Sequence, residues 1–155
     1  MTTETKYDSR ADTLAHIARV NDLLLDAATN LAHRGEVHDA SKLEEPEKSA
    51  FDALVPKLKD FAYGSDEYRA CLREMKPALA HHYAANSHHP EHFENGVEGM
   101  TIFDFLEMLI DWKAASERMK NGGDIRKSVE INTPRFNLSP QMVALLNNTI
   151  KEFGW

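Results

Sequence analysis

Apolar residues recur at the spacing of an α-helix along most of this chain, and this pattern restricts the fold more than any other sequence feature. The clearest case lies between residues 8 and 32, where Gly and Pro are absent and a stripe is formed by Leu14, Ile17, Val20, Leu24 and Leu31. No run alternates between apolar and polar residues as a half-buried β-strand would. The sequence therefore predicts an all-α fold.

Five further helical segments are expected after the first. They cover residues 38–43, 47–62, 66–86 and 102–119, and a last segment starts at residue 140. Gly35 is expected to end the first helix, and Pro56 and Pro77 are expected to kink or break the helices that contain them. The histidine-rich stretch 87–99 lacks helical periodicity and is predicted to be a loop, while the segment up to residue 138 shows no clear pattern.

Two helix starts carry recognisable capping residues. Thr101 followed by Asp104 resembles a capping box, with Asp in the place that Glu takes more often. Ser139 and Pro140 suit the N-cap and the first position of the last helix. We therefore expect helices to begin at residues 102 and 140.

The length and the charge limit the domain number and the partners. A chain of 155 residues is close to the usual size of one domain, so residues 1–155 are expected to form a single domain. Its 18 Lys and Arg against 25 Asp and Glu give a formal net charge of -7, which disfavours binding to polymeric nucleic acid. One cysteine allows no internal disulfide, and no segment resembles a signal peptide or a membrane span. These features predict a cytoplasmic protein that does not bind membranes.

Histidine is concentrated in one short part of the sequence. Five of the eight histidines lie within twelve residues: His81, His82, His88, His89 and His92. His82 and Asn86 are four residues apart and share a helix face, and the later histidines can converge on them from the loop. A solvated polar loop is the alternative, but so many histidines with so few charged neighbours favour a metal or phosphate site.

Three further features supply candidate ligands. The pair His38-Asp39 offers an imidazole and a carboxylate, although Asp39 could instead only cap the short helix that follows. Asp111 lies in the most apolar helical segment, where a carboxylate is costly unless a partner or a cation neutralises it. His16 faces the apolar side of the first helix, and on its own a buried, hydrogen-bonded histidine is the simpler interpretation.

Two more carboxylates lie near Asp111 in the same segment. Asp104 is seven residues earlier and Glu107 is one turn earlier, so one helix face could present two or three carboxylates. The alternative is that Asp104 only caps the helix and that Glu107 is exposed, and for Glu107 we expect exposure.

The order of these residues resembles the HD superfamily of metal-dependent phosphohydrolases, whose pattern is a His, a His-Asp pair and a distant Asp on a later helix. The matching segments are HIARV (16–20), HDASK (38–42), HHPEHFENGVEG (88–99) and MLIDWKAA (108–115). HDASK is similar to the HD-x-G-K variant of the HD-GYP cyclic-dinucleotide phosphodiesterases, with Ser41 in place of Gly and without the Gly-Tyr-Pro signature. The block HHYAANSHHPEHF is also similar to that of a group of short bacterial and phage proteins assigned to the HD fold.

The resemblance implies an HD-type helical bundle that binds one or two divalent transition metal ions (Mn, Fe, Co, Ni or Zn). Its implied first-metal ligands are His16, His38, Asp39 and Asp111, with Asp39 able to bridge to a second ion. His82 and His88 are candidates for a second metal site, and His82 could instead protonate the leaving oxygen. The candidate catalytic residues are Asp39, Lys42 and His82, and the candidate substrate-binding residues are Arg19, Lys42, Asn86 and His89. Among these, Lys42 is expected to hold a phosphate oxygen.

The expected function is hydrolysis of a phosphate ester or anhydride of a nucleotide by a metal-activated water. A deoxynucleoside mono- or triphosphate is the first expectation for the substrate, and a cyclic dinucleotide is the second. Two alternatives stay open: an HD-fold di-iron oxygenase, and a non-catalytic protein that binds a nucleotide or a metal. The segment that ends at Trp155 is expected to pack on the bundle or on a partner subunit of a homo-oligomer.

Overall fold

The computed structural model describes residues 7–60, 65–118 and 123–155. These residues form helices and the segments that join them, and they contain no β-strand, so the predicted all-α class is confirmed. The length of the chain predicts one domain, and the structure groups the chain into two compact units, residues 1–37 and residues 38–155.

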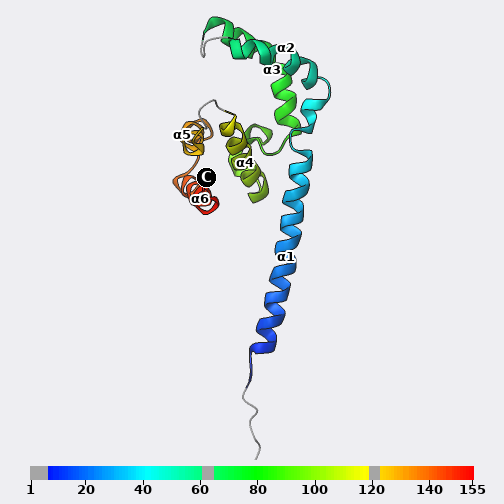
Figure 1. Ribbon diagram of the computed structural model, residues 1–155, viewed down its shortest axis with the longest axis vertical. Helices are drawn as coiled ribbons and strands as arrows, with labels where there is room; N and C mark the ends of the chain where they lie inside the picture. Colours follow the sequence, from blue (N-terminus) through cyan, green and yellow to red (C-terminus); the bar gives the residue numbers. More distant parts are fainter. Residues whose placement is uncertain (1–6, 61–64, 119–122) are drawn as a thin grey trace, which may run out of the picture. The chain divides into compact units, whose positions relative to one another are not determined.

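The first unit contains one long helix, α1 (Arg10–Val37), which Figure 1 shows as unbroken. The predicted end at Gly35 is wrong, because the helix continues through this residue to Val37. A glycine inside a helix costs about 1 kcal/mol relative to Ala, and a helix of 28 residues tolerates that cost. None of the side chains of α1, all of which are described, is buried.

The second unit contains the remaining elements in this order: η1 (Ala40–Leu43), α2 (Glu47–Asp60), α3 (Asp66–Ala85), η2 (Pro90–His92), η3 (Gly96–Gly99), α4 (Ile102–Glu117), α5 (Ile125–Arg135) and α6 (Pro140–Phe153). The predicted helices between residues 38 and 119 are therefore present, the first of them as the short 3-10 helix η1. Two predicted helix ends, at residues 62 and 119, lie outside the described residues. The predicted loop 87–99 holds only the two 3-10 turns η2 and η3.

Three of the described helices contain a proline and do not break, and one of them is α5 with Pro134. Pro56 is within α2 and Pro77 is within α3, so the breaks considered for them are absent from these helices as described. Tertiary packing compensates for the lost backbone hydrogen bond. Leu54 of α2 is buried with Cys71 and Met75 of α3, which holds the two helices together.

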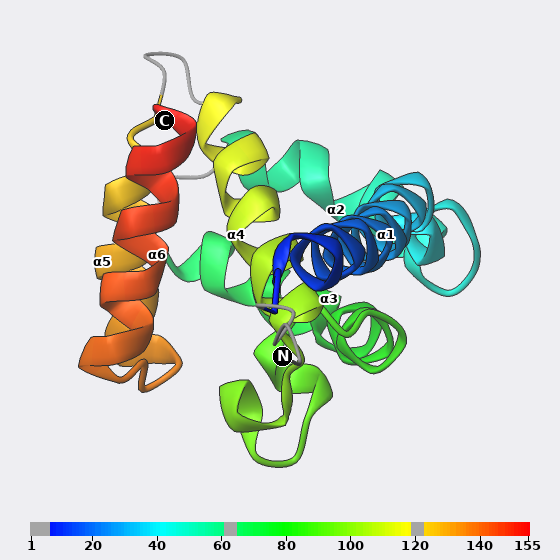
Figure 2. The same ribbon diagram turned by 90° about the horizontal axis from the view of Figure 1, so that it is seen from below.

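The last three helices share one hydrophobic core. Leu109 of α4, Val129 of α5 and Ile150 of α6 are buried in it, and Figure 2 shows α6 lying along α5. Trp155 packs against this core, and its ring stacks on Phe153 with 4.6 Å between the centroids. The C-terminal segment therefore packs on its own bundle, which is one of the two outcomes expected from the sequence.

Capping hydrogen bonds fix where these helices begin. Asp104 N donates to Thr101 Oγ1 at 3.2 Å and Thr101 N donates to Asp104 Oδ2 at 2.8 Å, which confirms the predicted capping box of α4. Ser139 Oγ accepts from Met142 N at 3.3 Å, which confirms the predicted start of α6. No element was predicted where α5 lies, and the first turn of this helix is capped by Asp124.

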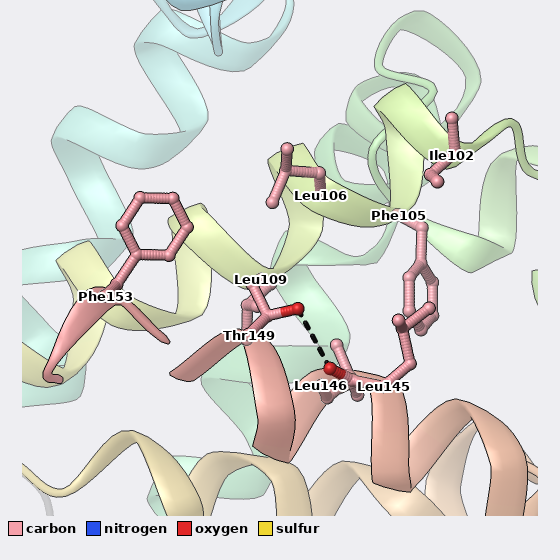
Figure 3. Close-up of a pocket in the computed structure, with 8 residues that line it drawn as sticks. All are labelled: Ile102, Phe105, Leu106, Leu109, Leu145, Leu146, Thr149 and Phe153. Carbon is pink, nitrogen blue, oxygen red and sulfur yellow. Dashed lines mark hydrogen bonds between the residues drawn. The ribbon is translucent and has the colours of Figure 1, made fainter. Parts of the chain in front are cut away.

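An apolar groove lies between α4 and α6. Phe105 and Leu109 line it from α4, and Leu145 and Phe153 line it from α6 (Figure 3). The Thr149 hydroxyl lies in the groove but is occupied, because it donates to the carbonyl of Leu145 at 2.9 Å. No helix in the described ranges is both long and apolar enough to cross a bilayer.

Candidate metal centre

Asp39 precedes the short helix η1 and has an unusual backbone conformation. Asp39 adopts a left-handed conformation with φ 57°, which is uncommon for a residue with a side chain and is found often at functional sites. Within the described structure its side chain makes no capping hydrogen bond to η1. The alternative role of Asp39 as a simple helix cap is therefore not the one that the structure shows.

Asp39 and three histidines form the first cluster of potential ligands. One ligand atom from each of Asp39, His82, His88 and His89 lies within 4.8 Å of every other. The Nε2 atoms of His82 and His88 lie 3.3 and 3.5 Å from Asp39 Oδ1, and His82 Nε2 lies 2.9 Å from His89 Nε2. The residue before η1, the end of α3 and the following loop thus meet at one point.

Two atoms of this cluster are buried without a hydrogen-bond partner among the described residues: Asp39 Oδ1 and His88 Nε2. A buried polar atom that lacks a partner costs about 1 to 3 kcal/mol, so such atoms are rare and usually have a reason. A cation between the carboxylate oxygen and the imidazole nitrogen would satisfy both atoms. The donor set therefore fits a metal ion.

His38, His88 and Asp111 form a second, adjoining cluster. His38 Nε2 lies 3.6 Å from Asp111 Oδ1 and 3.6 Å from Asp39 Oδ2. The rings of His38 and His88 are 4.4 Å apart between centroids, and His88 belongs to both clusters. The structure thus brings together three of the four predicted first ligands, His38, Asp39 and Asp111.

Two glutamates lie next to the Nδ1 atoms of the histidine rings, on the side that points away from the clusters. Glu107 Oε1 lies 2.8 Å from His38 Nδ1 and 3.2 Å from His88 Nδ1. Glu47, which is completely buried, accepts from His82 Nδ1 at 2.9 Å and from His81 Nδ1 at 2.8 Å. In a neutral imidazole, a carboxylate that accepts from Nδ1 leaves the lone pair on Nε2, and in His38, His82 and His88 this is the atom that faces the clusters.

The histidines of the two clusters fall into two groups, one with a lowered pKa and one with a raised pKa. Burial lowers the pKa of His82 and of His88, and burial together with these two rings lowers the pKa of His89 to about 3. These three imidazoles are neutral at pH 7, as metal ligands must be. The hydrogen bond to Asp111, supported by Glu107 and Asp39, raises the pKa of His38 to about 9.

The two cluster aspartates are ionised for a related reason. Burial raises the pKa of Asp39, but the hydrogen bond and charge of Lys42 outweigh it and leave the pKa below its usual value. Burial also raises the pKa of Asp111, and the hydrogen bond and charge of His38 again give a lowered pKa. Neutral imidazoles and ionised carboxylates are the ligands that first-row divalent metals prefer.

Lys42 and Asn86 lie at the edge of the first cluster. Lys42 Nζ donates to Asp39 Oδ2 at 2.5 Å, as their spacing of one turn suggests, and it lies 5.6 Å from the centre of the Phe51 ring. The Asn86 amide donates to Ser41 Oγ and to the carbonyl of His82, both at 2.8 Å. Their predicted roles in binding substrate stay predictions.

His16 and Arg19 belong to the first unit, where both side chains are exposed on α1. Because α1 is unbroken from His16 to Val37, about 32 Å of helix separates His16 from the residue that precedes His38. The roles predicted for His16 and Arg19 stay predictions.

Sequence reasoning missed both glutamates that hold the rings. Glu107 was expected to be exposed, and this is wrong, since its side chain is 13% exposed and faces two histidines. Its spacing of one turn from Asp111 was the available signal. Glu47 follows Pro46 at the start of α2, and the sequence around it carries no mark of burial. The sequence also left open which histidine pair serves the site, and the structure uses His82 and both members of the second pair.

Comparison with protein families assigns the chain to one family over nearly its whole length. Residues 5–152 match the model of the family of unknown function DUF5662, so this chain belongs to that family. Searches of curated proteins and of solved structures gave no match.

Proposed function

We propose that this chain is a metal-dependent phosphohydrolase that acts on a phosphate ester or anhydride of a nucleotide. The observation that carries the proposal is the pair of buried, unpartnered atoms, Asp39 Oδ1 and His88 Nε2, inside a set of histidine and carboxylate donors drawn from the described residues. The resemblance to the HD superfamily and the matching position of the His38-Asp39 pair support it. The nucleotide substrate, with a deoxynucleoside phosphate ahead of a cyclic dinucleotide, rests on that resemblance alone.

The surroundings of each residue in the centre suggest its role. Asp39, His82, His88 and His89 would hold one ion, and His38 and Asp111 adjoin it. When bound, a divalent transition metal polarises a phosphoryl oxygen and lowers the pKa of a water molecule towards neutrality. His82 suits the role of a ligand better than that of a proton donor, because burial lowers its pKa.

Lys42 would supply the positive charge for the substrate. Its ammonium group pairs with Asp39 at the edge of the cluster, and its side chain is 38% exposed, so it can also reach an anion from solvent. A lysine in that place can stabilise the negative charge that grows on phosphate oxygens during attack by water. The local cation also explains how a chain of net charge -7 could bind an anionic substrate.

The test combines metal analysis with a substrate screen. The purified protein is loaded with Mn²⁺, Co²⁺, Ni²⁺ or Zn²⁺, its metal content is measured, and release of phosphate or nucleoside is followed on a panel of deoxynucleotides and cyclic dinucleotides. We expect at least one bound ion per chain and turnover of one substrate class. Asp39→Ala should lose metal and activity together, Lys42→Ala should keep the metal and slow turnover, and His33→Ala should change neither, since His33 is exposed on α1.

Three outcomes would contradict the proposal. A protein that binds no ion would remove the metal centre itself. Oxygen uptake with iron and no phosphate release would favour the di-iron oxygenase. Metal binding without turnover, combined with a melting temperature raised by a nucleotide, would identify a non-catalytic binding protein.

A further inference from the structure

The first unit presents a helix whose apolar side has no cover within the unit. Its described part consists of α1 and the three residues before it. A single helix cannot bury its own apolar side chains and gains most of its stability from packing against something else. Leu14 is 55% exposed, Ile17 is 57% exposed and Leu24 is 64% exposed.

The apolar side chains of α1 share one face. At 100° per residue, Leu14, Ile17, Val20, Leu24 and Leu31 fall within one half of the helix circumference, and we call this set the α1 face. Every charged residue from Asp12 to Glu36 falls on the opposite half. The uncharged side continues from residue 13 to residue 35, which corresponds to about 33 Å of helix.

The spacing along the α1 face is that of a helix that pairs with a copy of itself. Ile17, Leu24 and Leu31 are seven residues apart, and Leu14, Asn21 and Ala28 form the accompanying series. These series correspond to the d and a positions of about three heptads. Asparagine at one a position is typical of parallel two-stranded coiled coils, because the two amides can bond to each other across the pair. In an antiparallel pair centred on the α1 face, Asn21 would oppose Leu24 instead.

The length of α1 also argues for a second α1 as its partner. The groove between α4 and α6 is apolar (Figure 3), but these helices have 16 and 14 residues and are about 24 and 21 Å long. Neither covers an uncharged face of about 33 Å. In the part of the chain that the structure describes, the next longest helix is α3, with 20 residues.

We propose that two copies of this chain associate through their α1 helices, which pair in parallel along the α1 face with Asn21 opposite Asn21 of the partner subunit. This inference is independent of the proposed function, because it uses no residue of the metal centre.

The test measures the oligomeric state of the full chain by sedimentation equilibrium over a concentration series. We expect a dimer, and we expect Leu24→Asp to raise the dissociation constant by at least about 100-fold, because two buried like charges would face each other. Leu23→Asp is the matched control. It changes the neighbouring leucine, which is 49% exposed and points about 100° away, so its dimer should persist.

Two further variants separate loss of pairing from loss of folding. Asn21→Leu should strengthen the dimer by about 10-fold or more, since a buried asparagine at an a position lowers coiled-coil stability. Asn21→Cys should form a disulfide-linked dimer on oxidation, whereas Asp22→Cys on the opposite half should not. The native Cys71 is buried, so it does not compete.

A monomer at every concentration would overturn the proposal. So would a dimer that withstands Leu24→Asp, or one that Leu23→Asp dissociates equally well, because either result would put the interface elsewhere.

Discussion

At the scale of single residues, the metal centre depends on the glutamates that orient the histidine rings as much as on the histidines themselves. Glu107 accepts from Nδ1 of His38 and lies within 3.2 Å of Nδ1 of His88, while Glu47 performs this task for His82. Two carboxylates thereby set which nitrogen of three imidazoles faces the shared space. They are the residues whose removal should affect metal binding without removing any ligand.

Glu107→Gln should lower the affinity of the protein for Co²⁺ by about 10- to 100-fold, which is the usual effect of losing a carboxylate behind a metal-binding histidine. The amide is a weaker acceptor than the carboxylate and can turn its NH₂ group towards the rings. Titration calorimetry with Co²⁺ measures the change. Glu94→Gln, at an exposed position, is the control and should bind as the unmodified protein does. Equal affinities in both variants would show that Glu107 does not orient the ligands.

The affinity of the second cluster, His38, His88 and Asp111, for a metal ion should also rise with pH because of His38. Its ordinary pKa of 6.5 is raised to about 9 by the hydrogen bond to Asp111, then by Glu107 and Asp39, so in the metal-free protein the ring is protonated at neutral pH. This proton stabilises the metal-free fold fully below pH 6.5, and the contribution is lost as the pH rises through about 9. An ion that binds Nε2 of His38 must displace the proton.

We therefore expect the apparent Zn²⁺ affinity to increase between pH 6.5 and 9 and to level off above that range. Competition with a chelator at each pH measures it. In His38→Ala the increase should be smaller, and an equally steep increase in that variant would assign the proton to another group.

At the scale of the helices, the sequence predicted helix starts correctly where hydrogen bonds between neighbouring residues determine them. The starts of α4 and α6 follow from Thr101 and Ser139, whose side chains bond backbone groups within three residues. The prediction failed at Gly35 because helix propensity is a weak preference that a long helix overrides. Glu107 was misplaced because only the tertiary structure decides whether its side of α4 faces solvent or His38.

The capping box of α4 should contribute measurably to stability. Thr101→Ala removes the acceptor for Asp104 N and should lower the free energy of unfolding by about 1 kcal/mol. Urea denaturation followed by circular dichroism measures this value. Thr29→Ala is the control, because the Thr29 hydroxyl only donates to Leu25 O inside α1, and its effect should stay within about 0.5 kcal/mol. Equal losses in the two variants would mean that the box adds no stability of its own.

At the scale of the whole molecule, the sequence predicted the class of fold and the meeting of His38 and Asp39 with Asp111, which lies more than seventy positions later. Their order along the chain resembles the pattern of the HD superfamily, and such an order can be recognised without knowing how the helices pack. The division into two units was not predicted, because the apolar stripe of α1 indicates a buried face without indicating what buries it. For the same reason, the sequence could not show which of the pairs His81-His82 and His88-His89 serves the site.

The position of His88 in both clusters has a consequence for stoichiometry. A neutral imidazole whose Nδ1–H is given to Glu107 keeps a single lone pair, so the ring can serve one ion at a time. The two clusters therefore compete for the first ion. If both clusters were occupied at once, one ion would lack the His88 nitrogen, and Asp39, whose Oδ2 lies 3.6 Å from His38 Nε2, is the neighbouring carboxylate that could replace it.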